Sequence, residues 1–262
     1  MNLILLDSEE LHDGRTTLRE RRARHVRKVL RSKVGDQVRV GLINGPQGTA
    51  TIRRIQVTSV ELELDGWTSD GPEPGHDVLM LAIARPKVLM RCLEHAAALG
   101  FGRIALFRSK RVDKNHLEST SLGLDACRQR LVLGLEQARR THLPELSLHR
   151  YFEPFANEAA LELATRSNRF VTDPDAPVAL AASAPTPEPF SLVIGPEGGL
   201  LDFEIETFER RGFQPVNVGR QPLRVESALS FITGQLMALR QRIESKSHGE
   251  QGPLIASGIE EL

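Results

Sequence analysis

The run VLMLAIA at residues 78–84 restricts the fold more than any other feature of this 262-residue sequence, because every residue in it is apolar. A strand with one face in water alternates apolar and polar residues, so an unbroken run indicates a strand that is covered on both faces. A segment with helical periodicity follows up to Gly100, and RIALF at Arg103–Phe107 has the character of a second strand. This order predicts a βαβ unit, and therefore an α/β fold with a mostly parallel sheet.

The rest of the C-terminal sequence continues the α/β pattern. Apolar runs predict further strands at Arg169–Thr172, Leu192–Gly195 and Pro215–Val218. Periodic segments predict helices at Leu122–Arg140, Phe155–Thr165, Leu201–Gly212 and Ser227–Arg242. The polar tail beyond residue 243 contains Gly252-Pro253 and is expected to be flexible.

The N-terminal part of the chain has a different pattern of apolar and polar residues. Short alternating stretches between Val38 and Leu64, broken by Asn44-Gly45-Pro46, predict the hairpins of a small β-barrel or sheet. The segment Gly66–Asp77 holds two prolines and three glycines, which is typical of a domain boundary. The sequence therefore predicts an N-terminal β domain over residues 1–75, an α/β domain over residues 76–243 and a tail over residues 244–262.

The composition excludes several classes of protein. With 40% hydrophobic and 26% charged residues the chain is of ordinary globular type, and no segment approaches the roughly 18 apolar residues that a membrane span needs. We therefore expect a cytoplasmic protein without membrane contact. Cys92 and Cys127 have neither a C-x-x-C pattern nor a histidine at ligand spacing, so we expect buried thiols and no metal site. No Ser/His/Asp or Cys/His arrangement indicates nucleophilic catalysis.

A strongly basic stretch lies between Arg15 and Lys33, although the formal net charge of the whole chain is +0. It holds nine basic residues and the single acid Glu20. Such a local excess is typical of a surface that binds a polyanion. The alternative is a solvated helix face. We favour the polyanion, because too few acids interleave to form i,i+4 ion pairs.

The stretch LVIGPEGGL at Leu192–Leu200 stops an apolar run in a glycine-rich turn. Glycine permits positive φ and close approach of a ligand, whereas Pro196 gives up a donor, so the turn presents a shaped main-chain surface. A phosphate cradle is disfavoured, because no Lys-Ser/Thr pair follows the glycines and the carboxylate of Glu197 would repel phosphate. A turn that only reverses a strand into a helix remains the alternative.

Three predicted strands end in unusual loops, namely TDPD at Thr172–Asp175, GPEGG, and VGRQPLRVESA at Val218–Ala228. Ligands of α/β proteins bind outside the carboxyl ends of the strands, so we expect these loops to line one pocket. In the third loop, Arg224 and Glu226 supply a cation and an anion just before a helix. Two roles are open for this pair, a structural salt bridge and a part in catalysis.

IGPEGG at Ile194–Gly199, followed by VGRQPLRVESA, resembles the paired signature of the SPOUT-class RNA methyltransferases, and specifically the family that methylates N3 of a uridine in 16S ribosomal RNA. RHVRKVLRSKVGDQVRV at Arg24–Val40 resembles the PUA-like RNA-binding module of that family. LEQARRTHLPEL at Leu135–Leu146 is similar to its EQ…R…PE segment. The resemblance spans the chain up to about Arg242 and leaves the tail outside.

The resemblance implies a SPOUT domain threaded into a deep trefoil knot, which is a rare exception to the rule that chains avoid knots. It also implies a homodimer that binds S-adenosyl-L-methionine (SAM) and acts on 16S rRNA of the small ribosomal subunit. The cofactor-binding residues that it implies are Thr172, Ile194, Gly195, Glu197, Gly198, Gly199, Val218, Gly219, Pro222 and Leu223.

For a methyl transfer to N3 of a uridine, charged residues of the third loop and of the basic stretch can be given roles, and for Glu226 we rank orientation above proton transfer. Arg224 is expected to hold the uridine, and Glu226 to orient Arg224 or to take the N3 proton. The residues expected to contact RNA are Arg22, Arg24, His25, Arg27, Arg31, Arg85, Lys87 and Arg140.

The chain departs from the family pattern at several positions, and these are His95, Ala98, Leu201, Gln221, Pro222, Val225 and Ser227. Two other hypotheses therefore stay open. One is an RNA- or ribosome-binding paralogue that has lost catalysis, which would have no need to bind SAM. The other is a methyltransferase that acts on a different RNA position, such as a ribose 2′-OH or a guanine of transfer RNA.

Overall fold

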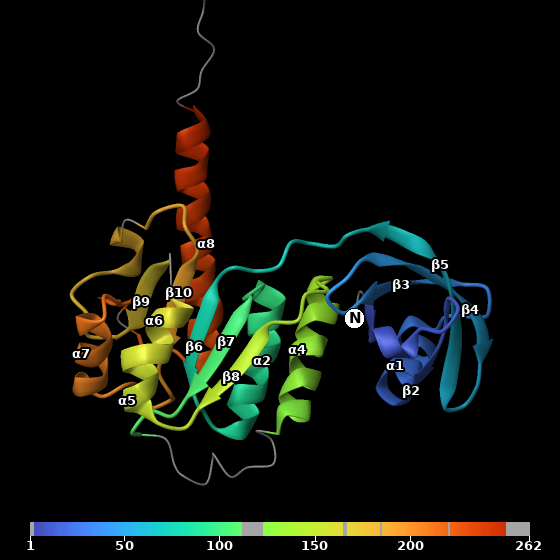
Figure 1. Cartoon of the computed structure of the whole chain (residues 1–262), viewed down its shortest axis with the longest axis horizontal. Coiled ribbons are helices and arrows are strands. Elements are labelled where there is room, and N and C mark those ends of the chain that lie inside the picture. The colour runs from blue at the N-terminus through green and yellow to red at the C-terminus, as the bar shows by residue number, and fades with distance from the viewer. Residues whose placement is uncertain (1–2, 112–122, 165–166, 184, 220, 250–262) are drawn as a thin grey trace, which may run out of the picture.

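The computed structural model describes residues 3–111, 123–164, 167–183, 185–219 and 221–249. Its N-terminal part forms a curled five-stranded sheet with the order β1-β3-β4-β5-β2 (Figure 1). β1 is parallel to β3, and the other neighbours are antiparallel. The strands are β1 (Ile4–Leu6), β2 (Arg15–Arg19), β3 (Gln37–Leu42), β4 (Gln47–Ile55) and β5 (Ser59–Ser69). The predicted hairpins are thus confirmed as β3 to β5, and the short strands β1 and β2 were not predicted.

Alternation along these strands buries one face of the N-terminal sheet, where Val38 and Val40 of β3 enter the core. The segments beside this core are η1 (Ser8–Glu10), α1 (Glu20–His25) and the π-helical η2 (Val26–Leu30). Ala23 and Val26 are buried in the core, whereas Arg24 is exposed. The basic stretch is therefore anchored by its few apolar residues.

The C-terminal part forms a six-stranded sheet with the order β11-β9-β10-β6-β7-β8, and every neighbouring pair is parallel. Its strands are β6 (Val78–Ala82), β7 (Arg103–Phe107), β8 (Glu145–His149), β9 (Asn168–Thr172), β10 (Phe190–Ile194) and β11 (Gln214–Val216). The predicted parallel sheet is confirmed. β8 was not predicted, because this edge strand is largely half-buried or exposed and lacks an apolar run.

Helices cover both faces of the parallel sheet (Figure 1). One face carries α2 (Pro86–Leu99), α4 (Leu124–Ala138) and α8 (Val225–Gly249), with the short η5 (Leu180–Ala182). The other face carries α5 (Phe152–Pro154), η4 (Phe155–Ala159), α6 (Ala160–Leu163) and α7 (Asp202–Arg210). In β6, Leu79 and Leu81 enter the first core, while Val78 and Met80 enter the second. Burial on both faces explains why the run at 78–84 contains no polar residue.

The C-terminal helix is longer than predicted. α8 continues through Gly249, so residues 244–249 of the predicted flexible tail are helical. The upper part of this helix projects beyond the domain in Figure 1. The rest of the predicted tail, residues 250–262, lies outside the described residues. The boundary placed near residue 75 falls between β5, which ends at Ser69, and β6, which begins at Val78.

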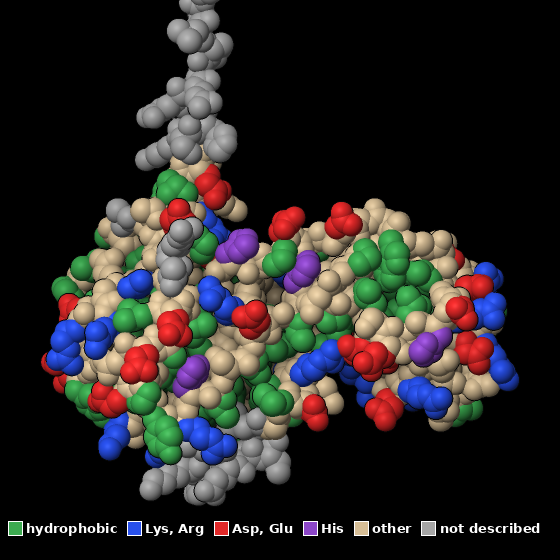
Figure 2. Space-filling model, viewed as in Figure 1, with side chains coloured by type: hydrophobic (Ala, Val, Ile, Leu, Met, Phe, Trp, Pro, Cys, Tyr) green, Lys and Arg blue, Asp and Glu red, His purple; other side chains and the backbone are tan. Residues whose placement is uncertain are grey.

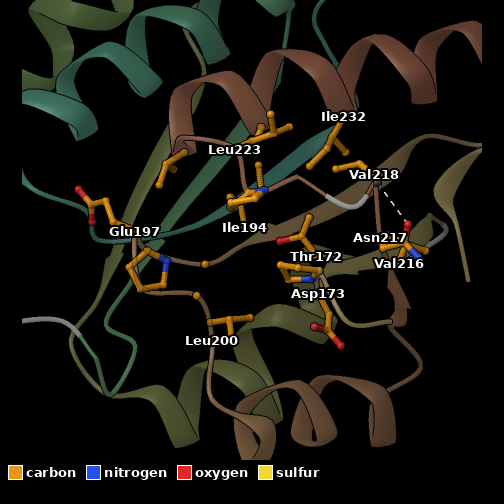
Figure 3. A pocket seen from close by; sticks show the side chains of 18 of the residues that line it. Thr172, Asp173, Ile194, Glu197, Leu200, Val216, Asn217, Val218, Leu223 and Ile232 are labelled. Atoms are coloured by element: carbon orange, nitrogen blue, oxygen red, sulfur yellow. Dashed lines mark hydrogen bonds between the residues drawn. The ribbon is translucent and has the colours of Figure 1, made fainter. Parts of the chain in front are cut away.

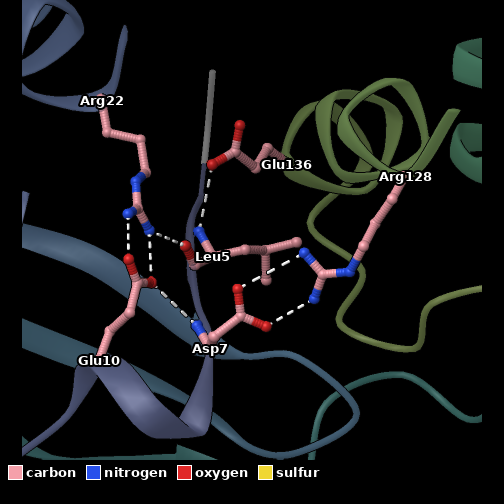
Figure 4. Close-up of polar contacts among 6 residues, drawn as sticks. All are labelled: Leu5, Asp7, Glu10, Arg22, Arg128 and Glu136. Carbon is pink, nitrogen blue, oxygen red and sulfur yellow. Dashed lines mark hydrogen bonds and ion pairs between the residues drawn. The ribbon is translucent and has the colours of Figure 1, made fainter. Parts of the chain in front are cut away.

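Charged side chains join the N-terminal sheet to α4 (Figure 4). The carboxylate of Glu136 on α4 is fully buried, accepts the main-chain N–H of Leu5 at 3.2 Å and pairs with Arg21 at 2.8 Å. Arg128, two turns earlier on α4, pairs with Asp7 at the end of β1. Removing one partner of a buried charge pair is strongly destabilising, so this junction fixes the N-terminal domain against α4.

Candidate cofactor cavity and RNA surface

A cavity of about 300 Å³ lies where β9, β10 and β11 end, at the start of α8 (Figure 3). Its wall is made of the three loops that the sequence analysis singled out. Every residue predicted to bind the cofactor lines it, and these residues are Thr172, Ile194, Gly195, Glu197, Gly198, Gly199, Val218, Gly219, Pro222 and Leu223. The parallel sheet thus brings segments that are distant in sequence to one edge.

The GPEGG turn needs glycine at two positions for different reasons. Gly199 has a φ of +75°, a region that side chains rarely adopt, and its N–H donates to the carbonyl of Pro196 at 2.8 Å. At Gly195 a Cβ atom would lie 3.0 Å from the backbone nitrogen of Leu200. The loop therefore folds back on itself so closely that main chain forms much of the wall.

The side chains that line the cavity are mostly apolar, and the charged ones are acids. Figure 3 shows Ile194, Leu200 and Ile232 on its wall together with the carboxyl-bearing Asp173 and Glu197. None of the described lining residues is Lys or Arg. Such a cavity suits a ligand with apolar surface and a positive charge, and it disfavours a phosphate.

The cavity is also lined by residues that the sequence analysis did not assign to it, and Asn217 and Ile232 are two of them. Asn217 lies one residue before the predicted Val218, and its Oδ1 accepts the N–H of Gly219 at 3.2 Å. Ile232 comes from the second turn of α8. Asn217 could have been found as an Asx-type residue two positions before a glycine. Nothing local in the sequence distinguishes Ile232 from the other buried residues of its helix.

Two acids at the cavity edge are bound to α2. Oε1 of Glu197 accepts the main-chain N–H of Arg85 at 3.0 Å, so it ties the GPEGG turn to the start of α2. Glu226 pairs with Arg91 at 3.2 Å. Among the described residues no ion pair joins Glu226 to Arg224, so the salt bridge considered from the sequence is wrong. Arg224 is exposed, directly before α8.

Burial also explains the state of the two cysteines. Cys92 on α2 and Cys127 on α4 are both buried thiols, as predicted. Burial raises the pKa of Cys92 to about 12, and the nearby negative charges of Glu226 and Glu197 act in the same direction. Within the described ranges, no group of three His, Cys, Asp or Glu side chains could hold a metal ion, and no helix is long and apolar enough to cross a membrane.

The residues predicted to contact RNA divide into engaged and exposed side chains. Arg22 donates to Oε2 of Glu10 at 2.8 Å and to the carbonyl of Leu5 at 2.9 Å. Its hydrogen bond with Glu10 raises the pKa of the Arg22 guanidinium. These donors of Arg22 are occupied within the fold, so its phosphate contact stays a prediction and is less favoured than that of an exposed arginine. Arg27 donates to the carbonyl of Val57.

Arg24 and Arg31 are exposed, and no side-chain hydrogen bond or ion pair holds either one among the described residues. His25 is half-buried. In the C-terminal domain Arg85 and Lys87 are exposed at the start of α2.

Arg140, which was also predicted to contact RNA, is partly engaged within the fold. It is half-buried and donates to the carbonyl of Glu73 at 3.1 Å, and burial lowers the pKa of its guanidinium. A Cβ atom at Gly100 would lie 2.9 Å from its guanidinium carbon. Arg140 therefore packs the boundary segment against the end of α2, and its predicted contact with RNA stays a prediction.

Comparison with known proteins agrees with this architecture. The RNA methyltransferase domain family matches residues 72–237, and the RNA methyltransferase PUA domain family matches residues 18–65. The ribosomal RNA small subunit methyltransferase E of Treponema pallidum is 27% identical over 237 residues, which cover 87% of each chain. Its counterpart from Synechocystis is 26% identical over 250 residues, covering 90% of this chain and 77% of that protein.

Solved structures share the whole fold. The ribosomal RNA small subunit methyltransferase E of Neisseria gonorrhoeae, bound to SAM, has a TM-score of 0.72 at 22% identity and covers 91% of this chain and 98% of its own. A methyltransferase from Legionella pneumophila, also in complex with SAM, has a TM-score of 0.73 at 25% identity and covers 92% and 97%. The chain therefore belongs to the RNA methyltransferase family with an N-terminal PUA domain, alongside the ribosomal RNA small subunit methyltransferase E proteins.

Proposed function

We propose that this protein is a SAM-dependent methyltransferase that modifies N3 of a uridine in 16S rRNA of the small ribosomal subunit. The observation that carries the proposal is the cavity at the carboxyl edge of the sheet. It combines a main-chain wall from the GPEGG turn with the carboxylates of Asp173 and Glu197, and it has no basic residue among its described lining. The relatives named above supply the substrate class.

The lining fits SAM in chemical character. The apolar side chains of Ile194, Leu200 and Leu223 offer surface for an adenine, and main-chain groups of the loops offer hydrogen-bonding partners. The two carboxylates are compatible with the positive charge of a sulfonium and an amino group. When bound, SAM supplies a methyl group activated by the positive sulfur.

The protein's own residues must position the uridine and deal with its N3 proton. Arg224 is exposed beside the cavity residue Leu223, so its guanidinium can bind a uridine carbonyl or the developing imide anion. Glu226 is only 13% exposed and pairs with Arg91. We assign it the role of holding the first turn of α8, and with it Arg224, against α2. Base extrusion exposes the Watson–Crick edge of the uridine.

The exposed members of the basic stretch would hold RNA phosphates, and Arg24 and Arg31 are the best placed of them. Arg85 and Lys87 would extend this contact toward the cavity. We place the protein in the cytoplasm as part of this proposal, because its substrate would be RNA of the small ribosomal subunit.

We propose further that the protein is a homodimer formed through a knotted C-terminal domain. Leu223 and Phe231 support a contact near the cavity, because their side chains are 44% and 50% exposed at the start of α8. Exposed large apolar side chains that cluster at one place are typical of an interaction surface.

The function is tested in two steps. Titration calorimetry with SAM measures whether the cavity binds the cofactor, and transfer of a labelled methyl group to small-subunit rRNA, followed by mass mapping, identifies the nucleotide. We expect micromolar binding and a single methylated uridine. Binding without transfer to any RNA would favour a paralogue that has lost catalysis, and a labelled ribose or guanine would favour a different acceptor.

A further inference from the structure

A second cavity, of about 550 Å³, lies at the carboxyl ends of β7 and β8 and at the start of α7. It is separate from the cofactor cavity, and none of the predicted site residues lines it. We call it the β7–β8 cavity. The residues that define it here are Arg108, Lys110, Arg150, Tyr151 and Phe203.

Two aromatic rings at this cavity are open to solvent. The side chain of Tyr151 is 72% exposed and that of Phe203 is 43% exposed. Phe203 is held in place by an edge-on contact with Phe152, with ring centroids 5.9 Å apart. Phe152 in turn packs against the buried Phe208. An exposed ring on a fixed support gives a stacking platform that is already formed before any ligand binds.

The cavity is also positively charged. Arg108, Lys110 and Arg150 line it, and none of the ion pairs among the described residues includes them. Two acids, Glu153 and Glu204, also line the cavity, so its three basic residues exceed its acids by one, and both acids accept hydrogen bonds from other residues of the fold. Glu153 accepts the side-chain amide of Asn157 at 3.1 Å.

The second acid, Glu204, is fully buried and fixes the cavity wall. Its carboxylate accepts Ser109 Oγ at 3.0 Å, the main-chain N–H of Lys110 at 2.8 Å and that of Leu201 at 2.9 Å. The loop after β7 is thereby tied to the first turn of α7. Because Glu204 is fully buried and accepts three hydrogen bonds within the fold, its carboxylate is not exposed to a ligand, whereas Lys110 and Arg150 are exposed.

The same contacts place this cavity beside the cofactor cavity. α7 begins three residues after Gly199, and Arg111 of the loop after β7 donates to the carbonyl of Gly198. Figure 2 shows hydrophobic and basic side chains next to one another below α5, at the lower edge of the C-terminal domain. A strand of RNA that delivers a base to the cofactor cavity can therefore continue over this surface.

We propose that the β7–β8 cavity binds an unpaired nucleotide of the RNA substrate that flanks the target uridine. The base stacks on Tyr151 or Phe203, and Arg108, Lys110 and Arg150 hold the phosphates on either side of it. This inference rests on the proposed function. A duplex would not use the site, because its bases are stacked on one another and their faces are closed.

The test measures binding of a short fluorescent single-stranded oligoribonucleotide to the full-length protein by anisotropy. The variant Tyr151→Ala/Phe203→Ala should raise the Kd about tenfold, which is typical for the loss of base stacking. Tyr151→Phe keeps the ring and should keep the affinity. Arg108→Glu/Arg150→Glu should weaken binding and flatten its salt dependence by about 1.4 in the log–log slope, because single strands lose roughly 0.7 for each contact.

Arg210→Glu is the matched charge control, because Arg210 is exposed on α7 but does not line the cavity. Its Kd should stay within about twofold of the parent. A Kd unchanged in both double variants, or an equal loss in Arg210→Glu, would overturn the proposal. A loss seen only with the assembled small subunit and not with naked RNA would also overturn it, in favour of a protein partner. SAM calorimetry on the parent protein reports on the proposed function separately, since it contains no RNA.

Discussion

The cofactor cavity and the basic stretch are built in opposite ways. The cavity is formed largely by main chain, with Gly195 and Gly199 required by close packing and by positive φ. The basic stretch is formed by long side chains, and the guanidinium of Arg22 donates hydrogen bonds to Glu10 and to the carbonyl of Leu5. A glycine-rich motif therefore predicts the geometry of its own turn. A run of basic residues predicts the sign of the surface charge, but not which side chains are free to bind a ligand.

This difference decides which substitutions should change the reaction and which should change only stability. Residues at the cavity act on a bound ligand through fixed geometry, so single changes there should have large and specific effects. Residues in the basic stretch act through summed electrostatics, so single changes should have small and graded effects.

The largest effect is expected at Arg224. Arg224→Ala removes the cation that we assign to the developing negative charge on the uridine, and such a loss typically costs about 2–4 kcal/mol, or roughly a hundred- to a thousandfold in rate. Arg224→Lys keeps the charge but loses the planar guanidinium, so its methylation rate should lie between those of the parent protein and of Arg224→Ala. Single-turnover methylation of small-subunit rRNA measures the rate, and calorimetry checks that the affinity for SAM is retained.

The variant Arg91→Ala distinguishes a catalytic role from a structural role at the start of α8. Arg91 pairs with Glu226 on α8, and we have not assigned it a contact with substrate. Its removal should lower the melting temperature and lower the rate by less than Arg224→Ala does. If the two variants lost stability alike and kept the same rate per folded molecule, Arg224 would be a structural residue.

The second effect concerns the main-chain wall. Gly199→Val places a branched residue at a φ of +75°, which costs roughly 1–2 kcal/mol per residue and must change the turn that carries the wall. The Kd for SAM should rise about tenfold or more. Gly212→Val is the matched control, because Gly212 has a φ of +82° at the far end of α7 and does not line the cavity. It should lose comparable stability with the Kd unchanged, and equal Kd values in both variants would place SAM elsewhere.

Much of the C-terminal fold could be predicted because the signals are local. The apolar runs of β6 and β10 indicate directly that these strands are buried. The three loops at the strand ends are marked by Gly and Pro, whose effect on the φ angle is local to the residue. The edge strand β8 lacks such a run, so it was missed. The three loops that line the cofactor cavity could be located for the same reason, whereas the individual cofactor-binding residues were predicted from the resemblance to the SPOUT methyltransferases.

The parts that could not be predicted depend on partners far away in the sequence. Glu136 lies in the EQ segment, but its bond to the N–H of Leu5 joins residues 131 positions apart. The engagement of Arg22 by Glu10 requires η1 and α1 to meet across the N-terminal sheet. The β7–β8 cavity likewise combines residues from two strand ends with Phe203 of α7, and no single stretch of sequence marks it.

A third, smaller effect is expected in the basic stretch. Arg24→Glu/Arg31→Glu should weaken RNA binding a few-fold and flatten its salt dependence, because both side chains are exposed and each phosphate contact adds to the slope. Arg22→Ala should instead lower the melting temperature and leave the slope nearly unchanged. Salt titrations of RNA binding, beside thermal unfolding, measure both. Equal slopes for the parent and the double variant would make the stretch a solvated surface.

The smallest effect is a pH dependence of stability at Glu10. The hydrogen bond from Arg22 holds the pKa of the Glu10 carboxyl below its usual value, with a further main-chain hydrogen bond from Asp7. A carboxyl whose pKa is lowered by folding stabilises the protein fully above its unfolded pKa of about 4.3, and this contribution is lost as the pH falls through the folded pKa. Glu10→Gln should therefore lower the free energy of unfolding at pH 7, and the difference from the parent should shrink as the pH falls below about 4. Urea unfolding of the parent and the variant, at pH 7 and at a pH below about 4, measures this difference. A difference that stayed constant over that range would mean that Glu10 and Arg22 contribute through packing, and the contrast between engaged and exposed arginines would have no electrostatic basis.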